Sequence, residues 1–315
     1  MKVIVAGGSG FLGQHAVAEL VDRGHQTVVL SRGNRACDDS DNVEHVACDV
    51  AAGQLPLDSW QGCDAIVNLI GIKREAAGQT FAAAHVDSTQ HLIEAARQAG
   101  VQRFVHISVV AARPDQRHTY HDTKWQAEQL VRDSGLDFTI LKPGVIYGPG
   151  DDMITHLVKM IRFCPVFPVV GQGTSILQPV SGADVARVIA STLTHDQAIG
   201  QTYDVVGPDP MLLREVVRTV AAGIPLNVWI LPTPIWFQRA AVWAMNVVFR
   251  NPLSTPAQLQ MLIDGLAGNP EAVARDLGVQ TQPFVAERIA EVQASIPPLC
   301  GRTLRIFLGS GFNTN

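Results

Sequence analysis

Gly7-Gly8-Ser9-Gly10-Phe11-Leu12-Gly13 is the stretch that decides the fold of this chain. The apolar run at residues 3–6 precedes it, and an amphipathic stretch at residues 14–23 follows it. A short apolar run bounded by glycine is typical of a buried strand, and the spacing of apolar residues after it is typical of a helix. We therefore predict a strand, a tight glycine turn and a helix at the start of the chain.

The three spaced glycines indicate phosphate binding. Gly7 allows the tight turn, Gly10 has no side chain to keep a pyrophosphate from the backbone, and Gly13 lets the helix pack closely on the first strand. The free N–H groups of the first helical turn, which contains Phe11 and Leu12, would hold the phosphates together with the helix dipole. A glycine-rich surface turn is the alternative, but the strand before the motif and the helix after it favour nucleotide binding.

The composition is that of an ordinary soluble globular protein with 315 residues, of which 47% are hydrophobic. The net charge is −5, from 24 basic and 29 acidic residues, and no block of like charge indicates a nucleic-acid surface. The odd, scattered cysteines and the absence of metal-ligand spacing favour reduced thiols, no structural metal and a cytoplasmic location. These cysteines are Cys37, Cys48, Cys63, Cys164 and Cys300. The first strand begins at Lys2, which leaves no room for a signal peptide.

Strand-like and helix-like stretches alternate through the first part of the chain. The apolar run at residues 65–71 is nearly continuous, as expected for a strand buried on both faces of a parallel sheet. The other expected strands cover residues 27–30, 43–48, 104–108, 138–141 and 203–206, and the expected helices cover 85–99, 119–132 and 182–193. This order predicts an α/β fold of Rossmann type, a doubly wound parallel sheet whose site lies at the carboxyl ends of the strands.

The alternation breaks after Pro143, where glycine and proline residues cluster. We predict a nucleotide-binding domain over residues 1–150, with returns to the sheet around 172–207, and a smaller, mainly helical substrate or partner domain over 151–315. Asp151-Asp152 has the acidic character of a helix start.

The ends of the second and third expected strands bear on the choice of cofactor. A fold that prefers NAD places Asp or Glu after the second strand, but this chain has Ser31-Arg32, with Arg35 close by. A guanidinium pairs well with a 2′-phosphate, so we predict NADP(H) rather than NAD(H); a solvated loop arginine is the alternative. Asp49-Val50 follows the third strand, where an adenine ring would lie.

Three residues form a candidate catalytic group. Tyr120 and Lys124 are four apart on one predicted helix and share a face, and Ser108 ends the preceding strand. The lysine charge would lower the pKa of the tyrosine, the tyrosine would exchange a proton with a substrate oxygen, and the serine would orient that oxygen. In the alternative reading, Tyr120 only packs and Lys124 only binds the cofactor ribose.

With the glycine motif, these residues make the chain similar to the extended or atypical branch of the short-chain dehydrogenase/reductase superfamily over about residues 1–220. Lys142-Pro143-Gly144-Val145-Ile146-Tyr147-Gly148-Pro149 resembles the family's Arg-Pro-x-x-x-Tyr-Gly-Pro segment, with lysine in place of arginine. Pro179-Val180-Ser181-Gly182-Ala183-Asp184-Val185-Ala186 resembles its His-Val-x-Asp-Val-Ala segment.

Within this branch, Asn68-Leu69-Ile70-Gly71-Ile72, followed by Gln79-Thr80-Phe81 and His85-Val86, resembles bacterial relatives of the NADPH-carrying accessory subunit of respiratory complex I. The resemblance implies that Leu69, Ile70, Gly71, His85 and Pro143 belong to the cofactor site with Lys124. Taken alone, histidines near a sheet such as His85 and His106 are more often core or edge residues than site residues.

Two departures from the extended family bear on mechanism. Val109-Val110 follow Ser108 where sugar-nucleotide epimerases and dehydratases carry a second hydroxyl, and His85 stands where many members carry asparagine. These differences disfavour sugar-nucleotide chemistry. Hydride transfer remains open, because the resemblance also implies relatives that use the nucleotide structurally.

The most apolar part of the chain, residues 224–249, holds Trp229, Trp236 and Trp243. Prolines limit the expected helix to residues 235–249, which is too short to span a bilayer. Trp236, Arg239 and Trp243 share one face, which suits a membrane surface or an apolar protein partner; a covered pocket or small-domain core is the alternative. Residues 256–278 are expected to form short helices and residues 284–295 a last one.

These features lead to two functional hypotheses of different classes. The first is an NADP(H)-dependent oxidoreductase acting on a hydrophobic carbonyl or alcohol, or on a quinone-related substrate, with Tyr120 as acid and base. The second is an accessory or assembly protein that binds NADPH without turnover, for which a peripheral place at the inner face of a membrane is expected. A sugar-nucleotide epimerase is a distant third.

Overall fold

The computed structural model describes residues 1–33, 42–75, 78–115, 119–151, 153–164, 166–224, 226–248 and 256–296. The chain forms two compact units. The first comprises Met1–Ile146, Pro179–Pro208 and Gly268–Pro283, and the second comprises Tyr147–Gln178, Asp209–Ala267 and Phe284–Asn315. Residues 268–283, which the sequence places in the second domain, belong to the first unit, and the chain returns to that unit at 179 rather than near 172.

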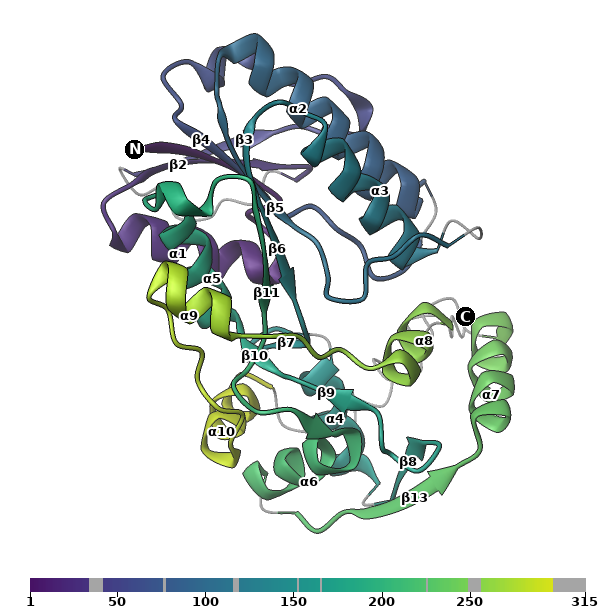
Figure 1. The fold of residues 1–315 in the computed structure, drawn as a ribbon. Coiled ribbons are helices and arrows are strands. Elements are labelled where there is room, and N and C mark those ends of the chain that lie inside the picture. Colours follow the sequence, from purple (N-terminus) through teal and green to yellow (C-terminus); the bar gives the residue numbers. More distant parts are fainter. Residues whose placement is uncertain are drawn as a thin grey trace, which may run out of the picture. The chain divides into compact units, whose positions relative to one another are not determined.

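The first unit is built on a parallel seven-stranded sheet (Figure 1), which confirms the predicted α/β Rossmann-type fold. Its strand order is β11-β6-β5-β4-β1-β2-β3, and every neighbouring pair is parallel. The strands are β1 (Lys2–Ala6), β2 (Gln26–Ser31), β3 (Val43–Ala47), β4 (Ala65–Asn68), β5 (Arg103–Ile107), β6 (Asp137–Pro143) and β11 (Gln201–Val205). The chain order reverses between β1 and β4, so a crevice is expected at their carboxyl ends.

Alternate side chains of β1 enter different cores because successive residues of a strand face opposite sides of the sheet. Val3 and Val5 pack in one core with Leu20, while Ile4 and Ala6 pack in the other with Trp60. Helices α1 (Phe11–Asp22) and α5 (Gly182–Thr192) cover the first face, and α9 (Glu271–Leu277) packs on α5. Helices α2 (Ser88–Ala99) and α3 (Tyr120–Arg132) cover the opposite face (Figure 1).

The structure corrects two predicted boundaries near the sheet edge. The fourth strand ends at Asn68 rather than at Gly71, and α2 begins at Ser88 rather than at His85. The segment Ala82–Asp87 forms a π-helical turn instead. Such turns often accompany functional sites, and this one contains His85. Single 3₁₀ turns complete this unit: η1 (Val50–Ala52), η2 (Leu57–Trp60) and η4 (Asp196–Ala198), with the short strand β10 (Val180–Ser181) before α5.

The second unit is mainly helical. After β7 (Ile146–Tyr147), its helices are α4 (Met153–Phe163), α6 (Leu213–Gly223), α7 (Ile235–Val248), α8 (Pro256–Asp264) and α10 (Ala286–Ala294). Two ribbons join them: β8 (Val166–Val170) with β13 (Trp229–Thr233), and β9 (Ile176–Leu177) with β12 (Met211–Leu212). Within the described ranges, no helix is both long and apolar enough to cross a membrane.

Asp151 caps α4, as the sequence predicts. Its carboxylate accepts hydrogen bonds from the N–H groups of Ile154 at 2.6 Å and Thr155 at 3.1 Å, and Asp152 lies outside the described residues. The described cysteines, Cys48, Cys63 and Cys164, are free thiols, while Cys37 and Cys300 fall outside the described ranges.

Candidate functional site

The glycine turn connects β1 to α1 at the edge where the sheet order reverses. Gly7 has a positive φ of 84°, and its N–H donates to the Leu30 carbonyl at 3.0 Å. The Gly10 N–H donates to the Gly7 carbonyl at 3.0 Å, and Gly10 is the N-cap of α1 without any side-chain cap. The first-turn N–H groups of α1 are therefore left to bind something other than a capping side chain.

The space around these glycines fits a phosphate group. A Cβ on Gly10 would meet only the Gly7 carbonyl oxygen, at 3.3 Å, whereas a Cβ on Gly13 would overlap the backbone of Gly7 and Gly8. Gly8 also requires glycine, because a Cβ there would lie 2.8 Å from the Val29 side chain. Gly13 and Gly8 thus serve packing, while Gly10 keeps the helix N-terminus accessible to an anion.

Phe11 and Leu12 contribute their backbone rather than their side chains to this turn. The Phe11 ring meets His15 edge-on at 5.2 Å and lies close to Gly182 at the start of α5. Leu12 packs against the core that contains Val5. Their side chains hold α1 in place, and their N–H groups lie in its first turn.

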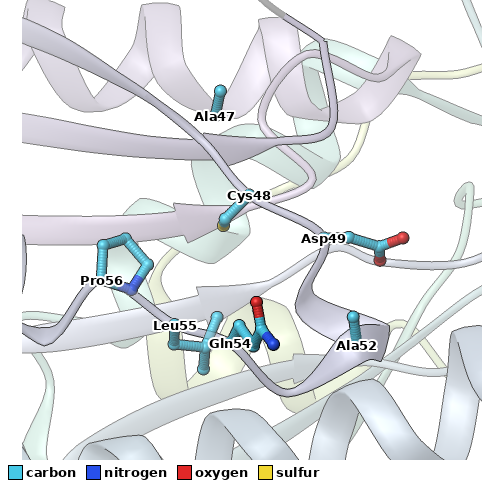
Figure 2. A pocket seen from close by; sticks show the side chains of 7 residues that line it. All are labelled: Ala47, Cys48, Asp49, Ala52, Gln54, Leu55 and Pro56. Carbon is cyan, nitrogen blue, oxygen red and sulfur yellow. The ribbon is translucent and has the colours of Figure 1, made fainter.

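A pocket of about 410 Å³ lies beside the end of β3 (Figure 2), where the sequence predicts the adenine ring. Figure 2 shows the chain turning at η1 and running back, so that Gln54, Leu55 and Pro56 face Cys48 across the pocket. Ala47, Asp49 and Ala52 complete its lining. The Asp49 carboxylate accepts the Ala51 N–H at 3.1 Å, and the Val50 side chain is buried in the core, so Val50 has only its backbone to offer a ligand.

The residues predicted to select the cofactor lie at the end of β2. The Ser31 hydroxyl donates to the Gly33 carbonyl at 3.1 Å, and the Arg32 side chain is exposed. The described residues of this strand end, 31–33, include no acidic residue. Arg35 lies outside the described residues.

Three predicted cofactor residues, Ile70, Gly71 and His85, lie around the ammonium of a fourth, Lys124. The Lys124 Nζ donates to the carbonyls of Ile107 at 3.0 Å and Ile70 at 3.4 Å. A Cβ on Gly71 would lie 3.1 Å from that Nζ and 3.7 Å from His85 Nε2. Burial lowers the pKa of Lys124 to about 8, although the nearby Glu128 carboxylate acts in the opposite direction. The structure therefore places a buried, titratable cation at the sheet edge. Leu69 follows the last residue of β4, and Pro143 is the last residue of β6, at the same edge.

His85 is a neutral hydrogen-bonding residue at this edge. The Ile72 N–H donates to its Nε2 at 3.2 Å, so Nδ1 carries the proton and donates to the Thr123 hydroxyl at 2.9 Å. Burial, reinforced by the Lys124 charge, lowers the pKa of His85 to about 2. This histidine therefore holds the backbone after β4 as a neutral imidazole and does not act as a cation.

Tyr120 and Ser108 do not form the arrangement that the sequence predicts. Tyr120 opens α3, and its ring packs edge-on against Phe81 and His85. Burial raises the pKa of Tyr120 to about 12, whereas we expected Lys124 to lower it. Lys124 donates to backbone carbonyls instead, and neither it nor Ser108 bonds the Tyr120 hydroxyl in the part of the chain that the structure describes.

Sequence reasoning missed the buried carboxylate that holds Ser108. The Ser108 hydroxyl donates to Glu128 Oε1 at 2.5 Å, and Lys142 Nζ and Arg132 Nη2 lie 3.3 Å and 3.7 Å from the same carboxylate. Glu128 follows Lys124 by four residues, so the helical repeat that relates Tyr120 to Lys124 could have found it.

Asn68 is the second residue that was missed. Its Nδ2 donates to the Thr89 hydroxyl at 3.0 Å and lies 3.3 Å from His106 Nδ1, while its Oδ1 accepts the Ile70 N–H at 3.1 Å. A single amide in an otherwise apolar strand was the available signal. His106 is a core histidine, whose pKa is lowered well below the ordinary value by burial and by the Lys124 charge.

The comparisons with known proteins agree with this geometry. The NAD(P)H-binding family matches residues 7–196. The chain is 30% identical over 229 residues to "NADH dehydrogenase [ubiquinone] 1 alpha subcomplex subunit 9, mitochondrial" of Rattus norvegicus, covering 69% of this chain and 59% of that protein. The chain thus spans less than two thirds of that relative's length.

A second relative is the 2-alkyl-3-oxoalkanoate reductase of Stenotrophomonas maltophilia, which is 29% identical and covers 71% of this chain and 76% of the relative. Among solved structures, a dTDP-glucose 4,6-dehydratase double mutant from Streptomyces venezuelae with NAD bound has a TM-score of 0.72 at 22% identity. The similarity covers 94% of this chain and 96% of that one, and at this identity it shows the fold.

We predict that Gly10→Val abolishes nucleotide binding and leaves the fold intact, because the valine side chain would occupy the space that the pyrophosphate needs. Titration with NADPH and far-ultraviolet circular dichroism measure the two properties. Gly13→Ala is the contrasting variant, since its Cβ overlaps backbone, and it should lower the free energy of unfolding by about 1–3 kcal/mol. Normal NADPH affinity in Gly10→Val would disprove the phosphate role.

The pKa of Lys124 predicts how stability depends on pH. The folded chain releases this proton near pH 8 and the unfolded chain only near about pH 10.4, so stability should rise across that interval. The rise should approach roughly 2 kcal/mol, measured as an increase in the thermal midpoint between pH 8 and pH 10. Lys124→Met should remove this rise, while Lys159→Met on α4 should keep it. An equal rise in Lys124→Met would contradict the assignment.

Proposed function

The chain belongs to the family of NAD(P)H-binding proteins, within the extended short-chain dehydrogenase/reductase type, and on this basis we propose that it reduces the carbonyl group of an apolar small molecule with NADPH. The observation that carries the proposal is the pair of titratable groups on α3: a phenol that keeps its proton, one turn before a buried ammonium. NADPH would supply the hydride when bound.

The protonated hydroxyl of Tyr120 suits the proton-donating step of a carbonyl reduction. A pKa of about 12 keeps the phenol protonated at neutral pH. Reduction of a ketone requires a proton at the carbonyl oxygen, which a protonated phenol can donate, whereas oxidation of an alcohol requires a base. Tyr120 is therefore proposed as the general acid.

Lys124 is proposed to hold the nucleotide ribose. It would also stabilise the Tyr120 phenolate that forms when the hydroxyl donates its proton. Two of its N–H donors bind the carbonyls of Ile70 and Ile107. An ammonium has three donors, so one has no protein acceptor among the described residues. Its position beside Gly71, at the carboxyl ends of the strands, is where a dinucleotide crosses a sheet of this type.

The preference for NADPH rests on the end of β2. Arg32 is exposed there, and the described residues of this strand end, 31–33, offer no carboxylate to a ribose 2′-hydroxyl. A guanidinium can form two charge-assisted hydrogen bonds to a 2′-phosphate. The turn at Gly7–Gly13 would hold the pyrophosphate, and the pocket beside Cys48 would take the adenine.

The apolar character of the substrate is inferred from two observations. Val109 and Val110 follow Ser108, so the strand end offers no second hydroxyl for a sugar. The Stenotrophomonas relative is named for a 2-alkyl-3-oxoalkanoate, a ketone with alkyl chains. We propose a ketone of this chemical class.

A second candidate is a protein that binds NADPH as a structural element without turnover. The specific observation in its favour is the Ser108 hydroxyl, which donates to Glu128 rather than facing Tyr120. The similarity to a subunit of mitochondrial NADH dehydrogenase supports it as well. In the first candidate the Tyr120 hydroxyl donates a proton to the substrate, whereas in the second it has no catalytic role.

The cofactor proposal predicts that NADPH binds more tightly than NADH and that Arg32→Ala removes the difference. Losing a charge-assisted phosphate contact costs about 1.5–3 kcal/mol, which corresponds to roughly ten- to hundred-fold in affinity. Calorimetric titration of both nucleotides against both proteins measures this change, and NADH affinity serves as the internal control. Equal affinities of the wild-type protein for the two nucleotides would contradict the prediction.

The catalytic proposal predicts that Tyr120→Phe lowers turnover of an apolar 3-oxo ester by about 10²- to 10⁴-fold, because the ring remains and the transferable proton is lost. NADPH affinity should stay within a factor of about two, since no ribose contact is assigned to the hydroxyl. Consumption of NADPH is followed by its absorbance. Tyr147→Phe, a buried tyrosine of the second unit, is the matched control and should retain turnover. Unchanged turnover in Tyr120→Phe would eliminate the acid role, and NADPH binding without turnover of any ketone tested would favour the second candidate.

A further inference from the structure

Helix α7 presents an apolar stripe to solvent. Trp236, Ala240, Trp243 and Val247 are spaced by four, three and four residues, so they lie along one face, and all four are exposed. The two tryptophans are 71% and 68% exposed. Only Val242 is buried among the α7 side chains that the structure describes. This pattern reverses that of an ordinary surface helix, whose apolar stripe is covered.

The Trp236 ring has one aromatic neighbour, and that neighbour is exposed as well. It meets Phe237 edge-on at 5.9 Å, and the Phe237 ring is 52% exposed. Clusters of exposed aromatic side chains on a soluble surface mark sites of interaction. The structure therefore agrees with the interpretation in which Trp236 and Trp243 form an exposed face. It does not agree with the alternative in which they fill the core of the second unit.

The charge on α7 itself is basic, because Arg239 is its one charged residue, while Asp264 ends α8, which packs against α7. From Val216 to Ile263 the sequence contains Arg218, Arg239 and Arg250 and no aspartate or glutamate, although the whole chain carries a net charge of −5. Arg239 lies on α7 between the two tryptophans, is exposed, and donates to Gln260 Oε1 at 3.2 Å without a carboxylate partner in the described part of the chain.

We propose that the α7 stripe docks the protein on an anionic lipid surface. Indole rings favour the boundary between headgroups and acyl chains, because they combine a large apolar body with one N–H donor. Basic residues beside such rings add attraction to anionic headgroups, and a helix of this kind lies in the plane of the interface. Helix α7 has 14 residues, which is long enough to lie on a bilayer surface and too short to cross the bilayer.

A second copy of the chain fits this surface less well. A symmetric dimer through the stripe would place the same patch against itself. The Arg239 side chains of the two copies would then approach each other, and α7 itself has no carboxylate to pair with them. The positive charge of Arg239 favours an anionic partner. A lipid surface is such a partner, and it does not need a shape complementary to the helix. The proposal involves the second unit alone and does not depend on the proposed reductase activity.

Vesicle flotation of the full chain, loaded with NADPH, tests the proposal. Wild-type protein should float with vesicles of phosphatidylglycerol and phosphatidylcholine and should stay in solution with vesicles of phosphatidylcholine alone. Trp236→Ser/Trp243→Ser should weaken binding at least about ten-fold and Arg239→Gln about five-fold, as expected for lost interfacial aromatic and basic residues. Binding should also fall when the salt concentration is raised, because exposed charges are screened.

Trp229→Ser is the matched control, because it removes a tryptophan that is 76% exposed on β13, outside the stripe, and it should retain vesicle binding. Unchanged NADPH affinity and circular dichroism in every variant show that the fold is kept. Failure of wild type to float, equal flotation with neutral vesicles, or equal flotation of the double variant would overturn the proposal. A dimer detected by light scattering that dissociates in the double variant would overturn it in favour of self-association.

Discussion

The lack of room at Gly13 is the constraint on which the nucleotide site depends. A Cβ at this position would overlap the backbone of Gly7 and Gly8. Because glycine has no Cβ, α1 can begin directly against the turn that leaves β1. A Cβ on Gly7 would in turn lie 3.2 Å from the backbone of Leu69 and Ile70, so the turn also touches the end of β4. These close approaches bring a helix N-terminus to the point where the order of the sheet reverses, which is where parallel sheets of this type bind ligands.

Burial, rather than the attraction between opposite charges, sets the ionisation of the groups beside that turn. Burial lowers the pKa of Lys124 to about 8 although the nearby Glu128 carboxylate raises it, and two carbonyls accept hydrogen bonds from the ammonium. The same cation and the same burial keep His85 neutral. The sheet edge therefore contains a buried cation beside the neutral side chains of His85 and Tyr120, with the Glu128 carboxylate near it.

Much of this arrangement could be predicted from the sequence. Short apolar runs predicted the positions of the strands. The glycine spacing, together with Tyr120 and Lys124, predicted a site at the carboxyl edge of the sheet, and Gly71, His85 and Lys124 do converge there. The hydrogen bond from Ser108 to Glu128 was missed, although Glu128 continues the four-residue spacing of Tyr120 and Lys124. The parallel ribbon of β8 and β13 was missed because Pro168 and Pro232, which interrupt most strands, are tolerated in a ribbon of only two strands.

Tyr120, Lys124 and Glu128 are spaced by four residues along one face of α3, and each meets a different part of the first unit. Tyr120 meets the π-helical turn, Lys124 meets the ends of two strands, and Glu128 meets Ser108 and β6. Inserting or deleting one residue among them would rotate the later groups by about 100° and turn them away from the sheet. The register of Tyr120, Lys124 and Glu128 therefore restricts insertions within this helix, whereas a change in the length of a surface loop leaves that register unchanged.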